Sequence, residues 1–216
     1  MPDFLFDIVV NHSIVFAAII GMIRFKSINS AYYPFLLIIW LGLANETLSL
    51  ALIYTAGNNM ANSNVYVLLE YWLILFQFYK WNDSSPKKYY VLAFLGLAVW
   101  STDNLVINTI TQNNSLFRVF YSFIIVFFSI DQINKIIIYE KEPLFKNAMF
   151  IICITFLFYY GFKAFVESFN MFHLGLSRGL LQNLWIILYF VNVFANLLFA
   201  LAVLCIPTKV KFIYPY

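Results

Sequence analysis

Among the ionisable residues within the apolar segments of this sequence, five are expected to share one layer of the membrane, where a charge needs a partner, water or a function. They are Glu46, Glu70, Asp103, Lys163 and Glu167. A charged side chain at the centre of a membrane helix costs about 2.5 to 3.5 kcal/mol, so several unpaired charges together would be strongly destabilising. The carboxylates outnumber the single lysine. This acidic surplus is suited to binding a cation or a protonated amine, or to relaying a proton.

Polar and small residues accompany these ionisable residues at helical spacing. Asn45 and Ser49 lie beside or one turn from Glu46, and Asn192 and Asn196 lie one turn apart in the last apolar segment. Such stripes turn toward the interior of a helical bundle rather than toward lipid. We therefore expect a ligand-binding pocket formed by Glu46, Glu70, Asp103, Lys163 and Glu167, with Asn192 opposite. The alternative is that these side chains only hydrogen-bond one helix to another.

The segments that carry these residues are long enough to cross a bilayer, which takes roughly 20 apolar residues. The sequence is 63% hydrophobic and 11% charged, whereas soluble domains contain about 25% charged residues. We predict an all-α, polytopic transmembrane helical bundle that forms one integral membrane domain over residues 1–216. Its seven transmembrane helices are expected near 4–23, 33–55, 64–81, 89–109, 116–136, 147–169 and 183–206.

Basic residues alternate with every predicted crossing, and this alternation indicates the orientation. Ten of the thirteen Lys and Arg residues fall on one side of the predicted membrane, and the positive-inside rule makes that side cytoplasmic. The N-terminus is then outside, the C-terminus is cytoplasmic, and the ionisable layer lies in the outer half. A composition rich in Asn, Ile, Lys, Phe and Tyr suggests an AT-rich bacterial genome, hence a multi-pass protein of the cell inner (cytoplasmic) membrane.

Familiar catalytic and cofactor motifs are missing from the sequence. It contains no H-E-x-x-H zinc motif, no G-x-S-x-G nucleophile elbow, no Gly-rich phosphate loop and no C-x-x-C pair. We therefore predict no metal ligands, no cofactor and no catalytic residues, and consider an enzyme the less favoured reading. A formal net charge of +3 is too small to indicate nucleic-acid binding.

Two functions fit this pattern, and a shared helix count cannot choose between them. The first is transport or binding of a cation, proton or small amine-bearing solute in an outward-facing acidic polar pocket. The second is a seven-helix membrane sensor or accessory subunit that signals to a separate cytoplasmic partner protein. A third, an intramembrane enzyme with a carboxylate as general acid or base, lacks a nucleophile. In each case the lipid bilayer surrounds the chain.

Overall fold

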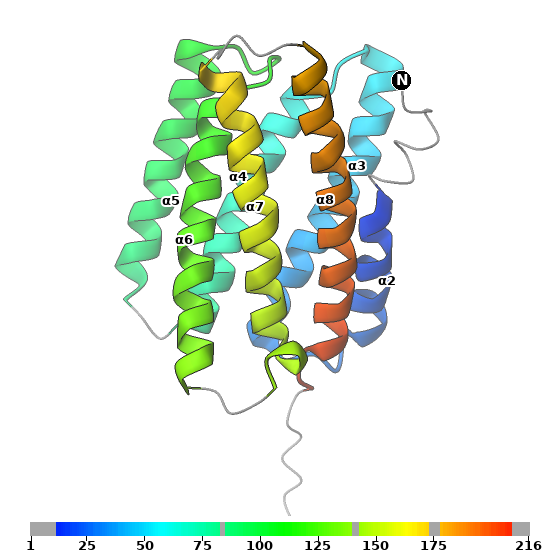
Figure 1. The fold of residues 1–216 in the computed structure, drawn as a ribbon, viewed down its shortest axis with the longest axis vertical. Helices are drawn as coiled ribbons and strands as arrows, with labels where there is room; N and C mark the ends of the chain where they lie inside the picture. Colours follow the sequence, from blue (N-terminus) through cyan, green and yellow to red (C-terminus); the bar gives the residue numbers. More distant parts are fainter. Residues whose placement is uncertain (1–11, 83–84, 140–142, 173–177, 209–216) are drawn as a thin grey trace, which may run out of the picture.

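A computed structural model describes residues 12–82, 85–139, 143–172 and 178–208 of the chain. Within these ranges the fold is all-α, as predicted, with seven α-helices (Figure 1). They are α2 (Val15–Arg24), α3 (Tyr33–Ala56), α4 (Met60–Trp81), α5 (Pro86–Ser101), α6 (Ser115–Tyr139), α7 (Ala148–Phe172) and α8 (Arg178–Cys205). Short 3₁₀ turns lie at His12–Ile14, Ser30–Tyr32 and Leu144–Lys146, and a π-helical turn, η3 (Thr102–Ile107), extends α5.

Each predicted span overlaps one of these helices, but the helices differ in their capacity to cross a membrane. Five helical segments of the described chain are long and apolar enough: Ser30–Ala56, Pro86–Ile107, Ser115–Tyr139, Ala148–Met171 and Gly179–Cys205. The helix α4 has 22 residues, yet its Asn, Glu and Gln side chains lower its hydropathy. The described part of the first predicted span is short, since residues 1–11 lie outside the described residues. The features fit a multi-pass helical membrane protein. The seven crossings and their orientation remain predictions.

The helices pack as a ring of sequential neighbours. Each helix from α2 to α8 contacts the next, and α8 returns to pack against α2, which closes the ring. The most extensive contacts are those of α7 with α6 and with α8, and α4 also contacts α6. Helices that follow one another in sequence usually pack side by side because their connections are short. The ring places side chains from α3, α4, α6, α7 and α8 around a common interior.

Local sequence signals explain where several helices begin and end. Pro34 and Pro86 lie in the first turns of α3 and α5, where a proline lacks only an N–H group that has no helical partner. Gly57 ends α3 with φ of +71°, a left-handed conformation that glycine adopts without strain. At the other end of α5, the π-helical turn η3 carries Asp103 and Asn104, which are both buried.

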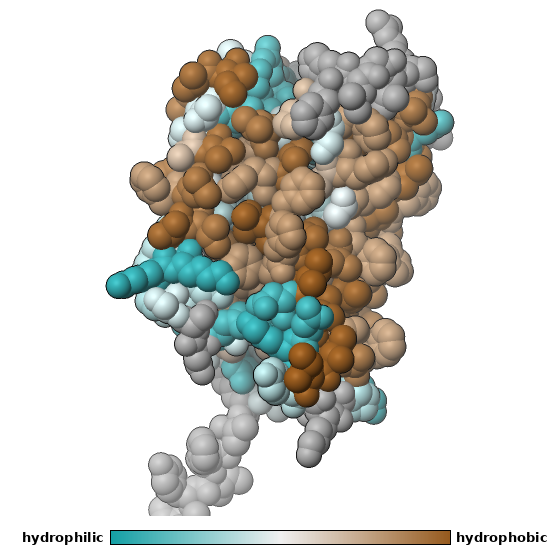
Figure 2. Space-filling view, turned by 60° about the vertical axis from the view of Figure 1, so that its left-hand side comes forward, coloured by the Kyte–Doolittle hydropathy of each residue, from teal (hydrophilic) through white to brown (hydrophobic). Residues whose placement is uncertain are grey.

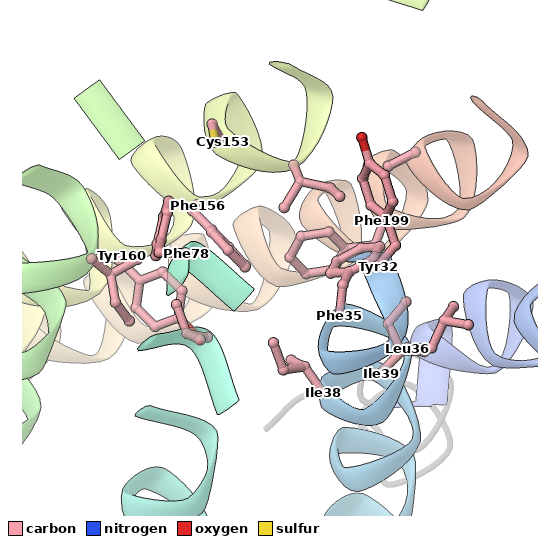
Figure 3. Close-up of a cluster of buried hydrophobic side chains, with 14 of the residues drawn as sticks. Tyr32, Phe35, Leu36, Ile38, Ile39, Phe78, Cys153, Phe156, Tyr160 and Phe199 are labelled. Atoms are coloured by element: carbon pink, nitrogen blue, oxygen red, sulfur yellow. The ribbon is translucent and has the colours of Figure 1, made fainter. Parts of the chain in front are cut away.

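A layer of buried aromatic side chains, which we call the aromatic layer, packs inside the bundle (Figure 3). Phe199 of α8 contacts Phe35 of α3 and Phe156 of α7, with ring centroids 5.4 and 5.6 Å apart, and Phe78 of α4 lies 6.2 Å from Phe156. All four rings are buried. Edge-to-face and tilted aromatic pairs of this kind stabilise a core beyond the area they bury. Cys153 is a free, buried thiol in the same cluster.

Arg24, the last residue of α2, holds the end of α8. Its guanidinium donates hydrogen bonds to the carbonyl oxygens of Val203, Leu204 and Ile206, which lie at the C-terminal end of α8 where carbonyls lack helical partners. A cation at the C-terminal end of a helix also interacts favourably with the helix dipole. The backbone N–H of Asn29 donates to the carbonyl of Pro207, so the first and last helices are joined at the lower end of the bundle.

Polar and apolar residues divide unevenly over the outer surface. Large apolar side chains are exposed along the helices, and Figure 2 shows them as a broad band above hydrophilic side chains that gather toward the lower end. Among the described residues that lower end holds Arg24, Lys26, Lys80, Lys87, Lys88, Lys135 and Lys146. The carboxylate of Asp131 lies among these basic residues and pairs with Lys135 at 2.7 Å. An apolar belt beside a basic end is the pattern expected for membrane helices.

Candidate functional site

A cavity of about 440 Å³ is lined by residues of the upper half of the bundle. In Figure 1, α3 and α7 end and α4 and α8 begin at the upper end of the bundle. The walls of the cavity combine ionisable, amide and aromatic side chains from α3, α4, α6, α7 and α8. A smaller chamber of about 80 Å³ lies deeper, between the cavity and the aromatic layer. Both spaces are lined by Glu46, Tyr66, Tyr159 and Asn192. We call the two spaces together the upper cavity.

Glu70 and Lys163 are connected across the bundle through a tyrosine. Lys163 on α7 donates a hydrogen bond of 2.5 Å to the Tyr121 hydroxyl on α6, and this hydroxyl donates one of 3.1 Å to Glu70 on α4. The Lys163 Nζ and a Glu70 carboxylate oxygen lie 4.0 Å apart, and both side chains are nearly buried. Tyr66 donates to the other carboxylate oxygen of Glu70 at 2.6 Å. A buried carboxylate with three such partners is charge-compensated.

Three tyrosine rings surround the Lys163 ammonium. Its Nζ lies 5.1, 5.4 and 5.6 Å from the ring centroids of Tyr121, Tyr159 and Tyr160. The face of an aromatic ring attracts a cation at such distances, and more strongly where water is excluded. The rings and Glu70 together explain how a lysine is accommodated in an apolar stretch of α7.

A second charge pair joins α6 and α7 nearer the upper end. The Arg118 Nε and a Glu167 carboxylate oxygen lie 3.9 Å apart, and Glu167 also accepts a 2.7 Å hydrogen bond from Ser115. The Nη2 of Arg118 donates to Ser63 at 2.9 Å and to Asn64 at 3.0 Å on α4. Its Nε is buried and has no hydrogen-bond partner among the described residues. Arg118 therefore pins α4, α6 and α7 together at the wall of the upper cavity.

Glu46 differs from the other two carboxylates of the upper cavity. It forms none of the ion pairs found among the described residues, and it is half-buried on α3. Because Glu70 is paired with Lys163, and Glu167 with Arg118, Glu46 is the carboxylate of the upper cavity that has no ion pair among the described residues.

Asn192 lines both parts of the upper cavity and makes no hydrogen bond to the described residues. One turn further along α8, Asn196 donates a 2.8 Å hydrogen bond to Ser13, so it joins the first described turn to the last helix. The two asparagines that the sequence places on one stripe thus have different surroundings. Asn196 links helices, whereas Asn192 faces the cavity.

Asp103 lies apart from the upper cavity, although the sequence analysis grouped it with the other carboxylates. It is fully buried. One oxygen accepts the backbone N–H of Phe117 at 2.8 Å, and the other accepts the side-chain amide of Asn108 at 3.0 Å. Phe117 lies in the first turn of α6, where N–H groups lack helical partners. Asp103, which lies in η3 after α5, therefore caps the N-terminal end of α6.

Arg118 was not among the site residues predicted from the sequence, although it lies within the predicted span 116–136. An arginine two residues inside a predicted span was the available signal, because such a side chain must find acceptors within the bundle. The structure supplies these acceptors from Asn64, Ser63 and Glu167.

Other polar stripes of the sequence connect helices. Asn62 of α4 donates hydrogen bonds of 2.9 Å to both Asn45 and Ser49 of α3. Gln77 accepts the backbone N–H of Phe35 at 2.7 Å and donates to the carbonyl of Ala31 at 2.8 Å, so it satisfies backbone groups at the start of α3. These contacts correspond to the helix-linking alternative that the sequence left open.

The described residues contain no group of three or more His, Cys, Asp or Glu side chains arranged to hold a metal ion. Comparison with known proteins gives no further guidance. No protein-family model matches the chain, and neither a curated protein nor a solved structure resembles it significantly.

Proposed function

We propose that this chain is a membrane protein with seven transmembrane helices that binds a small amine-bearing solute in the upper cavity and transports it. The observation that carries the proposal is Glu46, a carboxylate at the cavity wall without an ion pair among the described residues. When all of them are ionised, the charged groups of the upper cavity are three carboxylates, Glu46, Glu70 and Glu167, and two cations, Arg118 and Lys163. The sum is one negative charge, which a single cationic group would neutralise.

The size and lining of the cavity favour an organic amine over a bare ion or a proton. Small-molecule sites commonly enclose roughly 300 to 1,000 Å³, and the larger space has about 440 Å³. Tyr159, Tyr189 and Trp185 line it together with several asparagines. Aromatic faces attract ammonium groups, and amides can hydrogen-bond a solute. A proton or a small metal ion would require neither this volume nor these rings.

The orientation we propose follows from the charge on the lower end. The basic residues gathered there would be cytoplasmic by the positive-inside rule, which would place the upper cavity on the outer side. A carrier would then release its solute past the aromatic layer, of which Phe156 and Phe199 line the smaller chamber. The assignment to a bacterial inner membrane remains a prediction from composition.

Binding is tested by the thermal stability of the detergent-purified protein. The panel contains sodium, potassium, methylammonium, ethanolamine, choline and tetramethylammonium at constant ionic strength. We expect one or more amines to raise the melting temperature of wild type, and Glu46→Gln to abolish that increase. Asp131→Asn, the same change at the exposed lower end, is the matched control and should respond as wild type does. If no amine stabilises wild type, or if Glu46→Gln responds fully, the proposal fails.

Transport is tested separately with protein reconstituted in liposomes. Uptake of the amine that stabilises the protein, reduced in Glu46→Gln and normal in Asp131→Asn, would support a carrier. Binding without uptake, together with a cytoplasmic protein that co-purifies in equal amount, would instead support the sensor or accessory subunit. The two functions use the same cavity, so the uptake measurement distinguishes them.

A further inference from the structure

A second cavity lies on the lower half of the bundle, outside the upper cavity and independent of the function proposed for it. It has a volume of about 240 Å³ and lies between α4 and α5. Most of its wall is aromatic and apolar, with Trp72, Phe76, Tyr79, Pro86, Tyr89 and Tyr90 among the lining residues. We call this space the α4–α5 groove. These walls form an apolar surface against which a hydrocarbon chain can pack.

Three lysines stand beside the α4–α5 groove. Lys80 follows Tyr79 at the end of α4, and its Nζ lies 5.3 Å from the ring centroid of Phe76, a wall residue. Lys87 and Lys88 follow Pro86 in the first turn of α5. The Lys88 Nζ lies 4.5 Å from the Phe128 ring centroid and 6.0 Å from that of Tyr89. All three lysines are exposed.

These lysines have no carboxylate partner among the described residues, where the exposed pair at this end of the bundle joins Lys135 to Asp131. An apolar groove with a basic rim matches the two parts of an anionic phospholipid, its acyl chain and its phosphate headgroup. On the face that Figure 2 presents, hydrophobic side chains lie above hydrophilic side chains that gather toward the lower end.

We propose that the α4–α5 groove is a binding site for an anionic phospholipid, with an acyl chain between α4 and α5 and the headgroup held by Lys80, Lys87 and Lys88. A zwitterionic lipid has the same chain, but its own cationic group weakens attraction to the lysines. A juxtamembrane lysine contributes about fivefold to the binding of anionic lipid. Removing two of the three should weaken binding by roughly 25-fold if their contributions are independent.

The test measures lipid binding to the whole purified protein by native mass spectrometry and by thermal stability. Phosphatidylglycerol and phosphatidylcholine with identical acyl chains are the two probes. We expect phosphatidylglycerol to bind more tightly to wild type, and Lys80→Gln/Lys87→Gln to lose that preference. Lys26→Gln/Lys146→Gln removes the same charge from exposed positions elsewhere at the lower end and should retain it. Ala93→Leu, which enlarges a side chain in the groove wall, should weaken binding of both lipids.

Equal binding of the two lipids by wild type would overturn the proposal, because the aromatic residues would then serve only as a general interfacial belt. Equal losses in the two lysine pairs would overturn it as well, since anionic lipid would then respond to the charge of the lower end as a whole. Unchanged binding in Ala93→Leu would contradict the placement of the acyl chain in the groove.

Discussion

The buried pair of Glu70 and Lys163 should contribute to stability as a coupled unit. The two side chains are only 7% and 8% exposed, and their charged atoms lie 4.0 Å apart. Removing one partner of a buried pair leaves the other charge uncompensated and typically costs 3 to 5 kcal/mol. Glu70→Gln also leaves one acceptor oxygen for Tyr66 and Tyr121, which costs about 1 kcal/mol more. We expect Glu70→Gln to lower the free energy of unfolding by about 4 to 6 kcal/mol, the sum of these two terms.

A second substitution should restore much of this loss. Lys163→Met removes the cation and keeps an unbranched apolar chain, so Glu70→Gln/Lys163→Met has no buried charge to compensate. We expect a coupling free energy of about 2 to 3 kcal/mol in the double-mutant cycle. The control cycle is Asp131→Asn/Lys135→Gln, an i,i+4 pair with side chains 52% and 44% exposed, where the coupling should be about 0.3 to 0.5 kcal/mol.

The assay is reversible unfolding in mixed mild and denaturing detergents, followed by circular dichroism. Both cycles are measured in the same detergent, so that differences in the unfolded reference state cancel. A Glu70–Lys163 coupling no larger than that of the exposed pair would refute the reasoning. It would mean that Tyr121, or water in the upper cavity, already compensates each charge alone.

Two further substitutions test the packing and the capping described above. Gly96→Ala places a Cβ 2.2 Å from the ring of the fully buried Tyr71 and should cost about 1 to 3 kcal/mol. Gly161→Ala meets no atom within 4 Å and should be neutral or stabilising by up to about 1 kcal/mol, so equal unfolding midpoints would contradict the packing. Asp103→Ala should cost about 1 to 3 kcal/mol through the lost bond to Phe117 and leave amine binding intact. Lost binding at unchanged stability would place Asp103 in the site.

Much of the fold could be predicted because membrane helices are long and apolar. A run of about 20 apolar residues has few alternatives to a helix in lipid, where every backbone polar group must be paired within the segment. The predicted spans accordingly overlap the seven helices of the described chain. The exact helix boundaries depend on contacts between side chains, which hydropathy averaged along the sequence does not describe. The π-helical turn after Ser101 is one example, because Asp103 and Asn104 fix it through bonds to the start of α6.

The candidate site could be predicted only in part. Helical spacing placed Glu46, Glu70, Lys163, Glu167 and Asn192 on interior faces, and these residues do line the upper cavity. Spacing within one helix does not reveal which residue of another helix lies opposite. The pairing of Lys163 with Glu70, and the role of Arg118 beside Glu167, depend on how α4, α6 and α7 pack. The sequence therefore could not show that two ion pairs leave Glu46 as the carboxylate of the upper cavity without an ion pair among the described residues.

The role of Glu46 is tested most directly by the free energy of unfolding of wild type and Glu46→Gln, with and without the amine that best stabilises wild type. Without ligand, Glu46→Gln should be as stable as wild type or more stable, because no ion pair is lost. At a hundredfold excess over the dissociation constant, the amine should add about 2.7 kcal/mol to wild type and almost nothing to Glu46→Gln. The same increment in both proteins would contradict a binding role for Glu46.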